Sequence, residues 1–207
     1  MNTEQANDIL REARTYLDLR EPIPLHWAVE YSDVFSEVWA HGDPTLQLAL
    51  AAHWMEDEEV VLAVGAAVRP FVTDERSIRA LDLVERWARG DHRIANGDWM
   101  RASVASKAAA SSAGVKADAL GDYANYDATA AIYEAVHVVL AVVSPNSPEA
   151  IDYYNNSDGV TTPAMAAIDA AANVRGDHTR LRDYIAAHHI QVTFEDIVNA
   201  ALSGARK

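Results

Sequence analysis

Apolar positions along this chain recur at helical rather than strand spacing. The stretch 73–89 shows this most clearly when projected at 100° per residue. Its inward arc consists of Ala80, Leu81, Val84, Trp87 and Ala88. The alternation of apolar and polar residues that marks a strand is almost absent, and glycine and proline are few. The pattern predicts an all-α protein.

Capping and helix-breaking residues set the expected boundaries. Asp43, Thr73, Asp98, Thr162 and Thr193 are of the types that cap helix N-termini, and Gly90 is placed to end one. We expect a single compact bundle of about nine or ten helices forming one domain over 1–207. The expected helices cover about 3–19, 26–40, 44–69, 74–89, 99–113, 117–143, 148–154, 163–175, 178–189 and 194–202.

Composition narrows the classes of protein. The chain has no cysteine, so neither disulfides nor thiolate zinc sites are expected. Its first twenty residues mix charged and apolar side chains, unlike a secretory signal. The longest apolar run, "AVHVVLAVVS", is half the length of a membrane span. We expect a cytoplasmic protein with no membrane association.

The negative charge is concentrated at the start of the chain. Residues 1–60 hold 13 acidic and three basic residues, so they carry −10 of the net charge of −14. Such a field repels nucleic acid and attracts basic partners. A surplus of acid that serves solubility alone is the alternative.

The helix expected at 74–89 pairs its own charges. Three acid-to-base pairs lie at the spacing i,i+4 with the acid nearer the N-terminus, each contributing about 0.2–0.5 kcal/mol. They are Glu75 with Arg79, Asp82 with Arg86, and Glu85 with Arg89. This matching argues against a phosphate-binding helix.

The segment "RSIRALDLVERWARGD" resembles a motif in a family of immunity proteins from bacterial polymorphic toxin systems. Three flanking segments, "LQLALAAHWMEDEEVVLAV", "MRASVASKAAASSA" and "ATAAIYEAVHVVLAV", are similar to helices of that family in the same order. The resemblance covers roughly 45–143 and includes Trp54 and Asp57. Glu58 departs from it, because the family has a small residue or cysteine there. The resemblance implies a protein that neutralises a cognate toxin, and it carries no catalytic motif.

Two sets of polar residues lie on apolar faces. His53 and Asp57 fall four residues apart within the apolar arc of the helix expected at 44–69, so a buried pair is expected. A second face contains Asp127, Glu134 and His137 together with three tyrosines. The step Glu134-x-x-His137 is the spacing of di-iron bundles, but the chain has no second copy. A buried polar network or a wet binding surface is the main interpretation, and a metal site the alternative.

These observations favour an immunity protein that binds a basic toxin through its acidic surface. Glu30, Glu37, Glu56, Glu58 and Glu59 are the residues that we expect to contribute to partner binding. We expect no enzymatic activity, no cofactor and no direct binding of nucleic acid. An acidic mimic of nucleic acid and a metal-dependent enzyme are the alternatives.

Overall fold

The computed structural model describes residues 1–18, 24–121, 123–156, 162–176 and 178–188. This part of the chain holds eleven α-helices and three short 3-10 helices, and no strand, so the all-α prediction is confirmed. Where we predicted one domain, contacts divide the chain into two compact units. Unit 1 comprises Met1–Trp54 and the chain from Arg182 onward, and unit 2 comprises Met55–Leu181.

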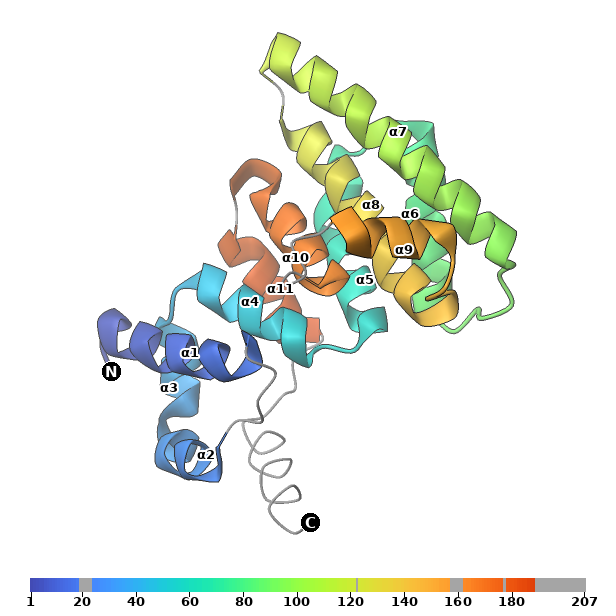
Figure 1. Cartoon of the computed structure of the whole chain (residues 1–207). Helices are drawn as coiled ribbons and strands as arrows, with labels where there is room; N and C mark the ends of the chain where they lie inside the picture. Colours follow the sequence, from blue (N-terminus) through green and yellow to red (C-terminus); the bar gives the residue numbers. More distant parts are fainter. Residues whose placement is uncertain (19–23, 122, 157–161, 177, 189–207) are drawn as a thin grey trace. The chain divides into compact units, whose positions relative to one another are not determined.

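Unit 1 is built around helix α1, which packs against α3 and α4 (Figure 1). Its core contains Leu10, Trp27, Val38 and Leu50. The helix predicted over 26–40 is instead two short helices joined by a 3-10 turn, at residues such as Asp33 that compete for backbone hydrogen bonds. The helices are α1 (Thr3–Asp18), α2 (Leu25–Tyr31), α3 (Phe35–His41) and α4 (Pro44–Trp54).

The continuous helix predicted over 44–69 is wrong. It breaks after Trp54, and α5 (Asp57–Val68) begins anew. Glu56 adopts an extended backbone, with φ −64° and ψ 150°, and its N–H donates to the Glu59 carboxylate at 3.2 Å. Carboxylates stabilise the positive end of a helix dipole, so the run "EDEE" favours a new N-terminus over continuation.

Unit 2 surrounds helix α8, which packs against α5, α6, α7 and α10. Ten residues of α8 are buried, among them Ile132, Val136 and Leu140. Among the described residues, α8 alone is long and apolar enough to cross a membrane by length and composition, a test that a buried core helix also passes. Besides α5, the helices of unit 2 are α6 (Glu75–Ala88), α7 (Asn96–Leu120), α8 (Ala124–Val143), α9 (Pro148–Asn156) and α10 (Pro163–Asn173). The last helix, α11 (His178–His188), is divided between the units after Leu181.

Some of the predicted helix caps are confirmed, and others lie at a different residue from the one predicted. The Thr162 hydroxyl accepts from the Met165 N–H at 3.2 Å at the start of α10, as predicted. Asp74, not Thr73, caps α6, and Asp98 lies inside the first turn of α7. The break predicted before 117 is also wrong, because α7 continues to Leu120 and is capped by Gly121, whose φ is 71°. The helix predicted at 194–202 lies outside the described residues.

Candidate functional site

The acidic residues predicted to bind a partner are divided between the two units. Glu30 on α2 and Glu37 on α3 belong to unit 1, and both side chains are exposed. Glu56, Glu58 and Glu59 lie at the start of α5 in unit 2, where Glu56 is exposed and the other two are half-buried. The prediction therefore corresponds to two separate acidic clusters, each described within its own unit.

Some of these carboxylates already have partners within the chain. Glu37 accepts from the N-terminal ammonium at 3.1 Å, and Glu59 accepts from the backbone N–H of Glu56. Burial, reinforced by the neighbouring carboxylates of Glu58 and Glu56, raises the pKa of Asp57. His53 belongs to α4 and Asp57 to α5, and the predicted pairing of the two stays a prediction because the His53 side chain lies outside the described part of the structure.

Four carboxylates of unit 1 are exposed and form no ion pair with any described residue. They are Glu4, Glu12, Glu30 and Asp33. The carboxylates of α6 are different, because arginines neutralise them: Glu75 lies 2.7 Å from Arg79. The charge that remains available to a partner in unit 1 is therefore concentrated on α1, α2 and the 3-10 turn after α2.

A buried carboxylate of α6 binds the residue that caps the C-terminus of α5. The Glu85 side chain is 9% exposed and lies 2.9 Å from Arg69 and 2.8 Å from Arg89. The pairs predicted for Glu75 and Glu85 are thus confirmed, but the pair of Asp82 with Arg86 is wrong. Asp82 instead bonds Arg69 at 2.9 Å, and Arg86 bonds Asp91 at 2.6 Å. This network is structural, because each charge is satisfied within the fold.

The polar face of α8 is graded from exposed to buried. Tyr123 is 51% exposed, whereas His137 is 3% exposed. The His137 Nδ1 lies 2.8 Å from the Tyr133 carbonyl, to which it donates, and Nε2 lies 3.4 Å from the Ser103 hydroxyl. The ring also stacks on Tyr153, with centroids 4.4 Å apart. Burial lowers the pKa of His137, so this end of the face holds a neutral imidazole in a packed network.

Two carboxylates near this network have buried oxygens without a hydrogen-bond partner, namely Oε2 of Glu134 and Oε2 of Glu149. Burial raises the pKa of Glu134, and it likewise raises the pKa of Asp127. Within the described ranges, no group of three His, Asp or Glu side chains is arranged to hold a metal ion. The metal site considered for Asp127, Glu134 and His137 therefore finds no support in their geometry.

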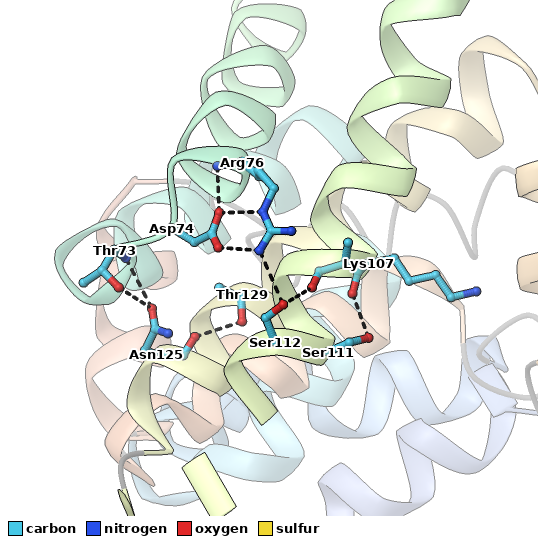
Figure 2. Close-up of polar contacts among 9 residues, drawn as sticks. Thr73, Asp74, Arg76, Lys107, Ser111, Ser112, Asn125 and Thr129 are labelled. Atoms are coloured by element: carbon cyan, nitrogen blue, oxygen red, sulfur yellow. Dashed lines mark hydrogen bonds and ion pairs between the residues drawn. The ribbon is translucent and has the colours of Figure 1, made fainter. Parts of the chain in front are cut away.

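Two adjoining cavities lie between the start of α6, the second half of α7 and the start of α8. Their volumes are about 360 and 250 Å³, and they share Thr73, Ala113, Lys116 and Asn125. Figure 2 shows Asn125 bonded through its side-chain oxygen to Thr73, at 3.2 Å to the N–H and 3.3 Å to the hydroxyl. We refer to the pair of cavities as the α6–α7–α8 recess.

The recess was not predicted from the sequence. Its shared residues come from three segments that are far apart in the chain, so no local pattern links them. The only local feature at the recess is the Thr73–Asp74 pair at the start of α6, where the sequence predicts Thr73 as the cap and the structure has Asp74.

Comparison of the chain with protein-family models, curated proteins and solved structures gives no match. The resemblance to immunity proteins therefore stays a prediction.

Proposed function

We propose that the protein is a cytoplasmic binding protein of the immunity type, which docks a basic toxin on the acidic surface of unit 1. The observation that carries the proposal is the set of exposed carboxylates on α1, α2 and the following turn that no described cation neutralises. Protein interfaces with this role need no catalytic group, in keeping with the absence of a recognisable catalytic motif in the sequence.

The physical role of this surface is to steer a partner. Unneutralised carboxylates raise the rate of encounter with a cationic protein by about 10-fold or more at low salt. Glu30 and Asp33 lie three residues apart, so both can act on one patch of a partner. The exposed Val29 beside them, 60% accessible, adds apolar area to the same part of the surface. After this electrostatic steering, the two proteins bury an interface of the size that is standard for protein complexes.

The direct test uses the polypeptide encoded immediately upstream of this protein in its genome. If the proposal holds, that polypeptide arrests growth when expressed alone, and co-expression of this chain restores growth. A direct complex of the two purified proteins should form with an association rate that falls steeply as salt rises. Growth arrest that this chain does not relieve, or an upstream polypeptide that is harmless, contradicts the proposed function.

Charge variants identify the surface. The double variant Glu30→Gln with Asp33→Asn should slow association several-fold, because it removes two unpaired charges. Glu75→Gln is the matched control, since Arg79 already neutralises that carboxylate and it lies in unit 2. A separate variant, Glu56→Gln with Glu58→Gln, reports on the cluster at α5. An association rate that only the α5 variant lowers would place docking on unit 2 instead of unit 1.

A further inference from the structure

The α6–α7–α8 recess holds a concentration of positive charge within an acidic protein. Three cationic side chains line its two cavities, namely Arg76, Lys116 and Arg175. The carboxylates that line it are Asp74 and Glu75, and each has an arginine partner. The chain carries a net charge of −14, so most of its surface is acidic. A recess in which every lining carboxylate is neutralised differs from that surface and requires an explanation.

Arg76 is committed to the fold. Its guanidinium binds both oxygens of Asp74, at 3.0 and 2.7 Å, and reaches the Ser112 hydroxyl at 3.5 Å, as Figure 2 shows. Asp74 in turn accepts from the Arg76 N–H to cap α6. The Asp74–Arg76 pair therefore adds no net charge to the recess. Its role there is to form part of the lining.

Lys116 and Arg175 are not balanced in this way. Neither forms an ion pair with a described residue. Lys116 borders both cavities, and Arg175 borders the smaller one. The lining of the recess thus carries two positive charges without an ion-pair partner among the described residues, and Lys116 acts on Asp74 only through its charge.

Arg175 is also held in an unusual backbone conformation. Its φ of 61° makes it the only residue besides glycine with positive φ among the described residues. Its guanidinium carbon lies 4.7 Å above the centre of the Phe71 ring. Left-handed conformations cost free energy for non-glycine residues and concentrate at functional sites. Here the residue in this conformation places its cation over an aromatic ring, and both side chains line the smaller cavity.

The remaining lining supplies a neutral donor and apolar contact. The side-chain oxygen of Asn125 accepts both bonds from Thr73, which leaves its amide nitrogen without a partner among the described residues. Ala113 and Leu120 provide apolar surface, and the Leu120 side chain is 78% exposed. A ligand with an apolar body would cover this surface.

We propose that the α6–α7–α8 recess binds a small phosphate monoester, with the phosphate between Lys116, Arg175 and the Asn125 amide, and an apolar body against Leu120 and Ala113. Two cations and an amide donor match a group that carries between one and two negative charges at neutral pH and three acceptor oxygens. All five of these residues line the smaller cavity, whose volume of about 250 Å³ is just below the range of drug-sized sites, about 300–1,000 Å³, and suits a small ligand. This site is independent of the proposed docking surface, because it lies wholly in unit 2.

Calorimetric titration of the full chain with phenyl phosphate at low ionic strength tests the proposal. Lys116→Gln and Arg175→Gly should each weaken binding roughly tenfold, the loss expected when one charge-assisted hydrogen bond is removed. Glycine is chosen at 175 because it accepts a φ of 61° without strain, so this variant should fold at least as well as the parent. Lys107→Gln is the control, since Lys107 lies outside the recess and 3.7 Å from Asp152.

Each outcome decides a part of the proposal. Binding that weakens in both recess variants and not in Lys107→Gln supports it. No measurable binding to the parent protein, or equal weakening in all three variants, overturns it. Benzoate that binds as tightly as phenyl phosphate overturns the assignment to a phosphate dianion. Inorganic phosphate that binds as tightly overturns the contribution of the apolar body.

Discussion

Gly65 on α5 lies directly against the carboxylate of Glu85 on α6. A Cβ added at Gly65 would lie 2.6 Å from the Glu85 Oε1, well inside van der Waals contact. The carboxylate cannot move freely, because Arg69 and Arg89 hold its two oxygens. Gly65→Ala should therefore destabilise the protein by about 1–3 kcal/mol, despite the better helix propensity of alanine. Urea unfolding at neutral pH measures the change.

The matched control is Gly114, a glycine in the interior of α7 in unit 2. A Cβ at Gly114 would lie 3.3 Å from the ring of Tyr126, a side chain that is 38% exposed and has room to shift. Gly114→Ala should leave stability unchanged or raise it by up to about 1 kcal/mol. Equal losses in the two variants would mean that the Gly65–Glu85 contact is not what constrains position 65.

Arg79 in α6 and Arg89 at the C-terminal cap of α6 form ion pairs of the same sequence spacing but different burial. Arg89 pairs with Glu85, which is 9% exposed, whereas Arg79 pairs with Glu75, which is 80% exposed. Removing a partner from a buried carboxylate leaves a poorly solvated charge, so Arg89→Ala should cost about 1–2 kcal/mol. Arg79→Ala should cost less than about 0.5 kcal/mol. Thermal unfolding of both variants would contradict this interpretation if Arg79→Ala were the more damaging.

The cap of α6 gives a prediction that depends on pH. The Arg76 side chain, with a further backbone bond, lowers the pKa of Asp74 from its ordinary value of 3.8 to about 2. Asp74→Ala should cost about 0.5–2 kcal/mol at pH 7, and Thr73→Ala less. Because the folded pKa is depressed, the stabilisation by ionised Asp74 is complete above pH 3.8 and is lost as the pH falls towards about 2.

Asp74→Asn separates the two roles of this residue. Asparagine retains the oxygen that caps the helix but loses the ion pair with Arg76. Its stability difference from the parent should therefore shrink between pH 4 and pH 2, where Asp74 becomes protonated. A difference that stays constant over this range would show that the ion pair contributes nothing to folding.

The sequence correctly predicts those helix ends that depend only on neighbouring residues. The start of α10 at Thr162 and the end of α6 near Gly90 depend only on adjacent residues, and both were predicted. The apolar arc continues across Glu56 and therefore predicts one helix there, although the reciprocal bonding of Glu56 and Glu59 depends on residues only three apart. Arg69 illustrates the contacts that the sequence does not predict. Its bonds to α6 arise only when two helices dock, and the recess around Lys116 likewise needs three docked helices.

Glu134 gives the prediction that distinguishes a buried network from an exposed polar face. Burial raises its pKa, and its Oε2 has no hydrogen-bond partner. Because the pKa of Glu134 is raised in the folded state, its neutral carboxyl stabilises the fold at pH values below its ordinary pKa of 4.5. This stabilisation is lost as the pH rises through the pKa of the folded state. The stability of Glu134→Gln relative to the parent should therefore increase from pH 4 to pH 8, since glutamine cannot ionise. Glu75→Gln, at an exposed and paired position, should show no such increase. Chemical denaturation of the parent and the two variants from pH 4 to pH 8 measures both trends. If the stability difference between Glu134→Gln and the parent did not change with pH, the Glu134 carboxylate would lie in water rather than in the packed network beside His137.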